Sequence, residues 1–395
     1  MKLPRVSPLV ALRMALVRLG FVVGRLLPLR SRVVLATGHG ATITGNLAWI
    51  RDGLREQMPD VPIVELTHRP GGGWRRLLGA GIHALRSGYH LATARLFIVD
   101  DYFFPMYVVA PRLGTRFVQV WHACGAFKKF GYSVLDKGFG ADEEYVLSIK
   151  IHANYDLCLV SAARFAQFYA EAFGTSVGRF TATLGIPRTD LFYDAERIAR
   201  TAAQLRARYA IPEGRRVVLY APTFRGERIT VARNPTELDL AALQSVLGAD
   251  HVVLLRSHPF VRARYASSPA SRGFVIDVSD HPDMNELMLV SDVLVTDYSS
   301  AMYEFALTGR PIVFFAPDHA AYEAERGFYL DYSTDLPGPV FTSSPELAAF
   351  LRAGAFDLER VGRFAGDSFD VADGKATRRF VDQVVAPAIR GNRAE

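Results

Sequence analysis

The sequence Asp292-Val-Leu-Val-Thr-Asp-Tyr-Ser-Ser300 is followed by Ala-Met-Tyr-Glu-Phe-Ala-Leu-Thr-Gly309 and then by Arg-Pro-Ile-Val-Phe-Phe315. An apolar run leads into a helix that begins after a serine pair and ends at a glycine, and a second apolar run follows. Apolar strands without strict alternation are typical of parallel sheets that are covered on both faces. The stretch therefore predicts a strand, a helix and a second strand of one parallel sheet.

The same alternation of strands and helices continues along the rest of the chain. Further strands are predicted at 33–36, 63–66, 96–99, 116–120, 157–160, 217–220, 252–256 and 275–277. Segments of helix length separate them, and turn residues interrupt the pattern near residue 190, so we predict two doubly wound α/β domains. A chain of 395 residues is long enough to give each domain its own core.

The interruptions set the predicted domain boundaries. We predict a basic amphipathic segment at 1–31, a first Rossmann-like domain at 32–190, a second at 191–370, and a C-terminal helix within 371–395 that crosses back to the first domain. Ligands of open α/β sheets bind at the carboxyl ends of the strands. Two such domains facing each other are therefore expected to form a central cleft lined by strand-end loops.

Composition narrows the functional class. The formal net charge of +6 suits nucleic acid, an anionic membrane or a phosphorylated substrate equally well. No nucleic-acid-binding motif is present, so nucleic acid is not expected as a partner. Cys124 and Cys158 have no disulfide-framework or zinc-site spacing, which indicates a reducing, cytoplasmic setting. No run approaches the roughly 20 apolar residues of a spanning helix.

The N-terminal segment carries apolar residues at helical spacing with arginines between them. The apolar positions are Leu9, Leu12, Leu16, Leu19, Val23 and Leu26. Arg13, Arg18 and Arg25 interrupt what would be the charge-free part of a signal peptide, which argues against export. The pattern is typical of a helix in a membrane interface, with a helix packed on its own domain as the alternative. Trp74-Arg-Arg-Leu-Leu78 is a second candidate with the same alternative.

The serine pair Ser299 and Ser300 stands where the strand 293–296 gives way to a helix. The backbone amides of a helix start, together with the helix dipole, make a ready phosphate site. A diphosphate can therefore dock there. The alternative is that one serine only caps the helix, which stabilises it by roughly 1 kcal/mol.

Two histidines each stand at the carboxyl end of a predicted strand, one in each predicted domain. His122 follows the strand 116–120, and His258 follows the strand 252–256. Imidazole titrates near neutral pH, so one ring can take a proton from an attacking hydroxyl while the other, if protonated, holds phosphate charge. A single histidine beside a strand is more often structural, and it is the pairing that favours catalysis.

Cationic side chains stand near the same strand ends. They are Arg225, Arg256, Lys128 and Lys129. Cations of this kind offset the charge of an in-line phosphoryl transfer. A solvated basic face is the alternative.

Three further features have weaker support. Cys124 invites a Cys/His nucleophile, but closeness in sequence does not create the required hydrogen-bond geometry. Asp100 and Asp101 end a strand and can bind a metal, with a solvated strand end as the alternative. His281 and Asp283 either approach a nucleotide or form a turn and a helix cap. We therefore predict no metal site and no cofactor.

Taken in order, these clusters resemble the CDP-glycerol glycerophosphotransferase family, the primases and polymerases of wall teichoic acid and related capsule polymers. The similar segments are 118–131, Gly185-Ile-Pro-Arg-Thr-Asp190, Tyr220-Ala-Pro-Thr-Phe-Arg225, Arg256-Ser-His-Pro259, 292–303, 309–318, 326–329 and 373–375. They cover roughly residues 32 to 390. Each fragment alone is weak, but their order and combination are hard to reach by chance.

The resemblance implies a GT-B architecture with the donor held mainly by the second domain. It associates His122 and His258 with catalysis, and the serine pair with donor phosphate. The expected donor-binding residues are Thr223, Arg225, Arg256, His281, Thr296, Asp297, Ser299 and Ser300, with Lys128 and Lys129 on the acceptor side. The chain departs from the family at Ala123-Cys-Gly125, where a glycine more commonly follows the histidine, and this bears on the backbone path beside His122.

The implied reaction moves glycerol phosphate, or another polyol phosphate, from CDP-glycerol or a related CDP-polyol to a lipid-linked polyprenyl diphosphate acceptor and releases CMP. The enzyme is expected at the cytoplasmic face of the cell membrane as a peripheral protein. We take His122 as the general base, with the exchange of the two histidines as the alternative. The identity of the polyol, the number of units added and the oligomeric state stay open.

Two other functions fit a chain of this kind. A GT-B glycosyltransferase would move a sugar from a nucleotide donor and release a nucleoside diphosphate. A non-catalytic, membrane-bound assembly factor would bind a nucleotide without turnover, but it needs no paired proton-transfer groups. Detection of CMP excludes the first, and transfer of label into a lipid-soluble product excludes the second.

Overall fold

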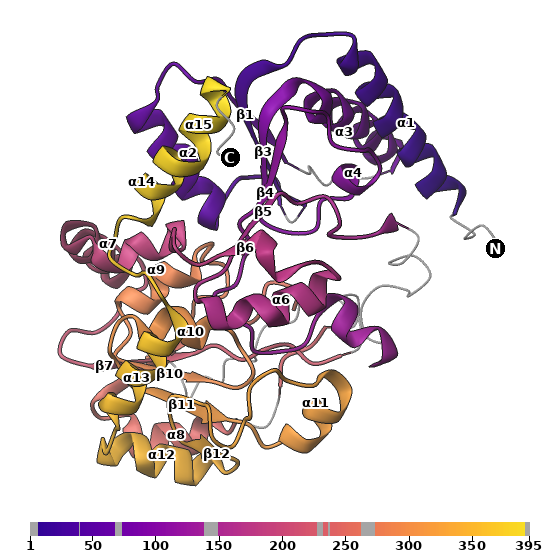
Figure 1. Ribbon diagram of the computed structural model, residues 1–395. Helices are drawn as coiled ribbons and strands as arrows, with labels where there is room; N and C mark the ends of the chain where they lie inside the picture. Colours follow the sequence, from indigo (N-terminus) through magenta and orange to yellow (C-terminus); the bar gives the residue numbers. More distant parts are fainter. Residues whose placement is uncertain are drawn as a thin grey trace. The chain divides into compact units, whose positions relative to one another are not determined.

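The computed structural model describes residues 7–38, 40–67, 73–137, 149–226, 232–235, 238–261 and 273–391, with the backbone alone at 73–76. The chain divides into two compact units. Unit 1 comprises Met1–His122, Ala141–Asp190 and Asp370–Glu395, and unit 2 comprises Ala123–Gly140 and Leu191–Phe369. Each unit is built around one sheet of six strands (Figure 1).

The sheet of unit 1 has the order β2-β1-β3-β4-β5-β6, with every neighbouring pair parallel. Its strands are β1 (Arg30–Ala36), β2 (Ile63–Leu66), β3 (Ala94–Val99), β4 (Arg116–Gln119), β5 (Leu157–Leu159) and β6 (Phe180–Thr181). The consecutive residues Val33 to Ala36 are all buried. Because successive side chains of a strand point to opposite faces, both faces of this sheet are covered.

The helices of unit 1 precede or connect these strands. They are α1 (Pro8–Arg25), α2 (Gly45–Gln57), α3 (Gly73–Thr93), α4 (Phe104–Tyr107) and α6 (Ala166–Phe173), with short 3₁₀ turns at Ala163–Phe165, Val177–Arg179 and Pro187–Tyr193. Within the ranges that the structure describes, no helix combines the length and the apolar character needed to cross a bilayer.

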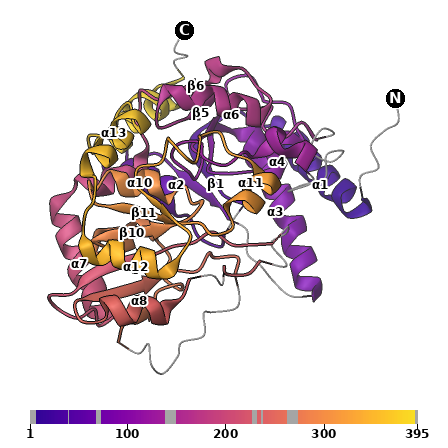
Figure 2. The same cartoon turned by 90° about the horizontal axis from the view of Figure 1, so that it is seen from below.

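Helices α1 and α3 lie side by side (Figures 1 and 2). A side chain at Gly20 of α1 would collide with the backbone oxygen of Leu85, and one at Gly88 of α3 would collide with that of Val17. The two glycines therefore allow a close approach of the two helix backbones. Val17, Gly20 and Phe21 are buried in this contact.

The C-terminal segment Asp370–Glu395 groups with unit 1. It forms α14 (Ala376–Phe380), a π-helical turn (Val381–Val385) and α15 (Ala386–Arg390), and α15 lies beside β1 and β3 (Figure 1). The carboxylate of Asp190 accepts hydrogen bonds from the backbone amides of Ala376 at 2.9 Å and Thr377 at 2.8 Å. These bonds satisfy amides at the start of α14 that have no partner within the helix.

The sheet of unit 2 has the order β12-β11-β10-β7-β8-β9 and is also parallel throughout. Its strands are β7 (Arg216–Tyr220), β8 (His251–Leu255), β9 (Val275–Asp277), β10 (Val293–Thr296), β11 (Ile312–Phe315) and β12 (Val340–Phe341). The strand order runs in one direction from β7 and then in the other from β10. This reversal is the doubly wound arrangement of dinucleotide-binding sheets.

Helices of unit 2 pack on this sheet. They are α7 (Ala195–Arg208), α8 (Leu240–Leu247), α9 (Met284–Leu289), α10 (Ala301–Ala306), α11 (His319–Arg326), α12 (Ser344–Ala353) and α13 (Leu358–Ser368), with a 3₁₀ turn at Gly131–Lys137. Helices α8 and α12 lie side by side (Figure 2) and bury Leu243 and Leu347 against Val218 and Val253 of the sheet. The side chain of Asp239 caps α8 by accepting bonds from two backbone amides of its first turn, at 2.9 and 3.0 Å.

The predicted fold class is confirmed, because both units are doubly wound parallel α/β sheets. Every strand predicted from the sequence is present. Strands β6 and β12 were not predicted, since each has two residues and therefore carries too little apolar pattern to recognise. The segment Ala123–Gly140 groups with unit 2, a grouping that the predicted boundaries did not contain.

Candidate active site

The sheet of unit 2 changes direction between the neighbouring strands β7 and β10. Open α/β sheets bind their ligands at the carboxyl ends of the strands beside such a reversal. The loop after β7 contains Thr223 and Arg225, and the loop after β10 contains Asp297, Ser299 and Ser300. Most residues predicted for donor binding therefore lie at one edge of one sheet.

Asp297 holds the two loops together. One carboxylate oxygen of Asp297 accepts hydrogen bonds from the backbone amide of Thr223 at 2.8 Å and from its hydroxyl at 3.0 Å. The other carboxylate oxygen of Asp297 accepts a hydrogen bond from Nη1 of Arg225 at 2.8 Å. Thr296, just before Asp297, donates its hydroxyl to the carbonyl of Ala221 at 2.7 Å. Thr223, Thr296 and Asp297 thus form a buried scaffold that fixes the shape of this edge.

Arg225 lies between two carboxylates. Beside Asp297, its guanidinium meets Asp318 through Nε at 2.5 Å and Nη2 at 3.0 Å. The guanidinium also lies 5.1 Å from the ring centroids of Tyr298 and Tyr322. Burial opposes the charged form, but the charges of Asp297 and Asp318 outweigh it and raise the pKa of Arg225. The positive charge of Arg225 is therefore balanced within the protein.

Ser299 and Ser300 stand at the start of α10 as predicted. The hydroxyl of Ser299 accepts a bond from the backbone amide of Ala301 at 3.2 Å, while Ser300 is the last residue before the helix and makes no side-chain cap. Both serines are half-buried, unlike the fully enclosed Asp297. Because α10 has six residues, its dipole is short, and any anion held there depends mainly on individual amide groups.

His258 follows β8 and is half-buried. Its Nδ1 accepts a hydrogen bond from the backbone amide of Phe260 at 3.2 Å, and its ring lies 4.9 Å from that of Phe224. Burial, followed by the positive charges of Lys128, Arg256 and Arg326, lowers the pKa of His258 to about 4. His258 is therefore neutral at physiological pH, unlike the protonated alternative considered from sequence.

Arg256 and His281 are both bonded into the protein. Arg256 donates Nη1 to the carbonyl of His281 at 2.6 Å. The His281 ring is buried between the hydroxyl of Tyr209, at 3.1 Å from Nδ1, and the carboxylate of Glu286, at 3.0 Å from Nε2. These contacts connect the ends of β8, α7 and α9, and the predicted donor contacts of Arg256 and His281 stay predictions.

Lys128 and Lys129 belong to unit 2. The backbone of Lys128 forms a bridge with Phe328, and the amide of Lys129 donates to the carbonyl of Gly327 at 3.1 Å. The structure thus groups the two lysines with His258, whereas the sequence analysis placed them on the acceptor side. Their contact with an acceptor stays a prediction.

His122 belongs to unit 1 and follows β4. Its side chain is 49% exposed, and Nδ1 lies 3.3 Å from the carbonyl oxygen of Asp100 and 3.7 Å from a carboxylate oxygen of Asp101. Its ring stacks on that of Trp121 with centroids 4.5 Å apart. In the parts of the chain that the structure describes, no group of three or more His, Cys, Asp or Glu residues is placed to hold a metal ion.

Three polar residues that the sequence analysis did not single out support the backbone at His122. Asn46 donates its amide to the carbonyls of Val120 and Trp121, both at 2.9 Å, and accepts the amide of Arg188 at 3.1 Å. Arg188 in turn donates Nη1 to the carbonyl of His122 at 2.7 Å. The third is Gln119, whose side-chain oxygen accepts the backbone amide of Trp121 at 2.8 Å. Arg188 could have been found from the sequence, because it lies in the family-like motif Gly185 to Asp190.

A buried polar network lies behind Trp121. Gln119 donates to the hydroxyl of Tyr155 at 2.9 Å, and that hydroxyl lies 3.0 Å from Nδ1 of His152. Burial lowers the pKa of His152 to about 3, against the opposing charge of Asp101. His152 is therefore a neutral, structural residue.

Cys124 and Gly125 explain the local departure from the family pattern. Cys124 is completely buried, so the Cys/His nucleophile has no accessible sulfur. Gly125 has φ +64°, and a side chain there would collide with the ring of Tyr303 in α10. The glycine is required at this position, two residues beyond where the family more commonly has one.

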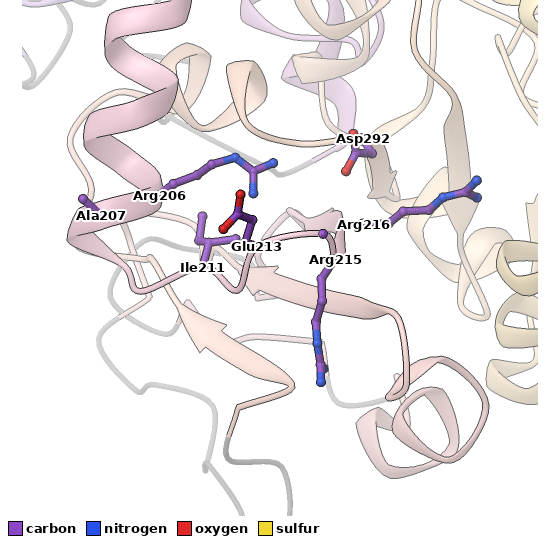
Figure 3. A pocket seen from close by; sticks show the side chains of 8 residues that line it. Arg206, Ala207, Ile211, Glu213, Arg215, Arg216 and Asp292 are labelled. Carbon is purple, nitrogen blue, oxygen red and sulfur yellow. The ribbon is translucent and has the colours of Figure 1, made fainter.

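A separate pocket of about 690 Å³ lies at the opposite edge of the unit 2 sheet. Arg216 opens β7 and Asp292 precedes β10, so the pocket is at the amino ends of these strands. Figure 3 shows charged side chains of both signs around it, including Arg206 and Glu213. The pocket is remote from the strand ends that carry the predicted site.

Two doubly wound parallel sheets, with polar residues at the carboxyl ends of their strands, make this an α/β protein of the GT-B-like class. The chain belongs to the CDP-glycerol:poly(glycerophosphate) glycerophosphotransferase family, whose model matches residues 21–386. It is therefore an enzyme of the glycerophosphotransferase type. The predicted family is confirmed.

Relatives and solved structures agree with this assignment. A teichoic acid ribitol-phosphate primase of Bacillus spizizenii is 37% identical over 360 residues, which cover 90% of this chain and 92% of the relative. A teichoic acid glycerol-phosphate primase of the same organism is 29% identical and covers 77% of each chain. A structure of a variant of the wall teichoic acid polymerase TagF matches the fold with a TM-score of 0.78 at 22% identity, covering 96% of this chain and 93% of that one.

Proposed function

We propose that this protein transfers a polyol phosphate from a CDP-polyol to a membrane lipid-linked acceptor in teichoic acid synthesis and releases CMP. The observation that carries the proposal is the family match, which extends from residue 21 to residue 386 and so includes both sheets. His122 and His258 follow strands at the carboxyl edges of these sheets, where open α/β sheets bind their ligands.

The proposed step is an in-line displacement at the polyol-side phosphorus. A hydroxyl of the acceptor loses its proton to Nε2 of His122 and forms the new P–O bond. The bond between that phosphorus and the bridging oxygen breaks, and the bridging oxygen leaves with CMP. His258 and the amides at Ser299 and Ser300 would stabilise the charge that moves onto the leaving group. Arg225 supports this edge through its bonds to Asp297 and Asp318.

We infer that CDP-ribitol is the first donor to test, with CDP-glycerol beside it. The ribitol-phosphate primase is more similar to this chain, and more completely covered, than the glycerol-phosphate primase of the same organism. One matched TagF structure is that of a variant with CDPG, which supports a CDP-activated donor for the family.

We propose that α1 and α3 attach the protein to the cytoplasmic face of the membrane. The face of α1 that is not packed on α3 leaves large apolar side chains in solvent, with Leu26 82% exposed. The exposed apolar residues are Leu9, Leu12, Leu19, Val22 and Val23 on α1, Leu26 directly after it, and Leu77, Leu78 and Ile82 on α3. The alternative is that the helix only packs on its own domain. This alternative explains why Val17 and Phe21 are buried, but not why these other apolar residues are exposed. Trp74 to Arg76 lie outside the described side chains.

The function is tested by incubating the purified full chain with either CDP-polyol and a synthetic polyprenyl diphosphate-linked acceptor. We expect CMP and a lipid product heavier by one or more polyol phosphate units. Release of a nucleoside diphosphate with a glycosidic product would establish the glycosyltransferase instead, and binding without turnover would establish the assembly factor.

Membrane attachment is tested by sedimentation with vesicles that contain phosphatidylglycerol. Leu12→Glu and Leu19→Glu place carboxylates on the exposed face of α1 and should strongly reduce binding, because the acyl boundary excludes them. Leu358→Glu, at an exposed leucine of unit 2, is the matched control and should bind like the wild type. Equal binding by all variants would refute this attachment.

A further inference from the structure

Arg32 of β1 is a buried cation of unit 1 that has no carboxylate partner among the described residues. The residue is 9% exposed and donates Nη2 to the hydroxyl of Thr93 in α3. Its Nε has no hydrogen-bond partner in the same part of the chain. Buried charges are normally paired. A buried guanidinium without a counterion therefore suits an anion that comes from outside the protein.

His90 is a second buried polar residue at the same place. It precedes Thr93 in α3, is 9% exposed, and has no hydrogen-bond partner for its Nδ1 among the described residues. Burial, followed by the positive charges of Arg32, Arg86 and Arg30, lowers the pKa of His90 to about 4. The ring is therefore neutral at physiological pH. We call these three arginines and His90 the amino-edge site.

The local structure of β1 and α3 brings the members of this site together. Between Arg30 and Val33, β1 has one more residue than the paired stretch of β3, which is a β-bulge. Bulges change the direction in which a side chain points. The guanidinium of Arg32 lies 5.4 Å from the ring centroid of Tyr89, and this ring meets that of His90 edge-on with centroids 5.2 Å apart.

The site lies at the amino edge of the unit 1 sheet. Strands β1, β3 and β4 are parallel, so their first residues share this edge. His122 follows β4 at the opposite, carboxyl edge. Strand β1 has 7 residues, and each residue of a strand spans about 3.3 Å, so the two edges are about 20 Å apart. The amino-edge site is therefore separate from the candidate active site.

Large apolar side chains are exposed at the same edge. Leu26, directly after α1, is 82% exposed, and Leu113, in the loop before β4, is 80% exposed. Arg112 connects these segments with the end of α3, because its Nη1 donates to the carbonyls of Leu27 at 2.7 Å and Ala92 at 3.0 Å. A lipid can place its headgroup at cations and its acyl chains beside leucines. A soluble phosphate ester has no use for the leucines.

We propose that the amino-edge site binds the phosphate of an anionic phospholipid headgroup, so that unit 1 selects anionic over neutral lipid. The phosphate supplies the counterion that Arg32 lacks, and the exposed Arg30 and Arg86 add charge. This inference rests on the proposed membrane attachment by α1 and α3 and adds the class of lipid. The apolar face of α1 does not by itself distinguish one headgroup charge from another.

Lipid selection is tested by sedimentation of the full chain with two kinds of vesicle, phosphatidylcholine alone and phosphatidylcholine with phosphatidylglycerol. A cation at an anionic surface strengthens binding by about fivefold. We expect Arg30→Gln and Arg32→Met each to lose at least about fivefold in affinity for the anionic vesicles, with unchanged affinity for the neutral ones. Unchanged affinity of both variants for the anionic vesicles would overturn the proposal.

Arg55→Gln is the matched control, because it removes the same charge from unit 1. The Arg55 side chain is 62% exposed and lies 3.8 Å from a carboxylate oxygen of Asp52 and 3.9 Å from one of Glu65. This variant should bind anionic vesicles like the wild type. An equal loss in Arg55→Gln and Arg32→Met would show that only the net charge matters, which contradicts a built site.

A purely structural role of the two buried residues is tested by denaturant unfolding without vesicles. Exchange of an unpaired buried polar group for an apolar one is neutral or stabilising. Arg32→Met and His90→Leu should therefore keep or raise the unfolding midpoint while they reduce lipid selection. A lower midpoint with lipid selection intact would mean that these residues serve only the fold. If a variant does not fold, the exposed Arg30→Gln decides.

The source of the phosphate is tested with glycerophosphoglycerol, which is the phosphatidylglycerol headgroup without acyl chains. We expect no displacement of the protein from anionic vesicles when its concentration equals that of the lipid. Displacement under these conditions would assign the site to a soluble phosphate ester and overturn the lipid assignment.

The failure of this inference differs from that of the proposed attachment. Leu12→Glu acts on the apolar face of α1 and should weaken binding to both kinds of vesicle. Wild-type binding by Leu12→Glu would count against the attachment itself. Lipid selection that persists in Arg30→Gln and Arg32→Met would refute the amino-edge site alone.

Discussion

His122 and His258 each follow the carboxyl end of a parallel strand, yet the charged groups around the two imidazoles differ in sign. The imidazole of His122 is half-exposed and faces the oxygens of Asp100 and Asp101. The imidazole of His258 is half-buried and lies among Lys128, Arg256 and Arg326. An oxygen acceptor favours a proton on the imidazole nitrogen nearer to it. An amide donor requires a lone pair on that nitrogen, and nearby cations disfavour a second proton on the ring. The neighbouring groups, and not the residue type, therefore decide which histidine can act as a base.

The largest expected effect comes from removing the base. His122→Ala should reduce CMP release by about 10²–10⁴-fold, because a general base contributes about that much to a rate. The measurement is kcat with a saturating CDP-polyol. Arg200→Gln, at an exposed position of α7, is the surface control and should retain wild-type rates. If the kcat of His122→Ala equals that of this control, His122 is not the general base, and the difference between the two histidines has no functional consequence.

The next largest effect is expected at Arg225, the buried cation of unit 2 whose charge two carboxylates neutralise. Asp297→Asn leaves the buried guanidinium of Arg225 without one of its two carboxylates, and breaking a buried ion pair costs about 3–5 kcal/mol of folding free energy. Denaturant unfolding measures this loss. Asp318→Asn is the matched variant and should cost less, since the Asp318 side chain is 25% exposed and solvent screens its charge. Equal costs would show that burial does not control the strength of these pairs.

A smaller effect concerns acid stability. The pKa of His152 is lowered to about 3, so the unfolded chain binds its proton near the ordinary value of about 6.5 while the folded chain does not. The stabilisation present above pH 6.5 is therefore lost progressively as the pH falls from there toward about 3. His152→Asn, which tolerates the positive φ of 68° at this position, should reduce that loss by on the order of 2 kcal/mol.

The control for acid stability is Phe173→Leu. Its ring stacks on His152 with centroids 4.0 Å apart, and the substitution weakens packing without removing a titrating group. Unfolding curves at several pH values should show a lower stability throughout with the wild-type pH dependence. If His152→Asn behaves in the same way, the neutral buried histidine is not the source of the acid sensitivity.

The smallest effect sharpens the comparison directly. Lys128→Met removes one of the cations that act on His258, so the pKa of His258 should rise. Titration of the histidine signals by NMR measures the shift. Lys129→Met is the control, because Lys129 is not among the cations that lower the pKa of His258. An unchanged His258 titration in Lys128→Met would mean that burial and the other two cations, and not Lys128, keep the ring neutral.

Much of the fold follows from local patterns. The stretch from Asp292 to Phe315 forms β10, α10 and β11 at nearly the predicted positions, because apolar runs and a glycine stop act within a few residues. The two-residue strands β6 and β12 could not be predicted from local patterns, since they form only through pairing with β5 and β11. The contact of α1 with α3 also escaped it, because it depends on two glycines 68 residues apart in the chain, Gly20 and Gly88.

Local patterns and motifs in the chain were sufficient to predict the class of fold, the family and the residues that stand at the strand ends. What each of those residues can do depends on contacts that form only in the folded protein. It placed Asp318 against Arg225, set Lys128 and Arg326 around His258, and turned an amide or an oxygen toward each imidazole. The physical reason is that strand and helix patterns arise from neighbours in the chain, whereas charge, burial and proton position depend on groups that only folding brings together.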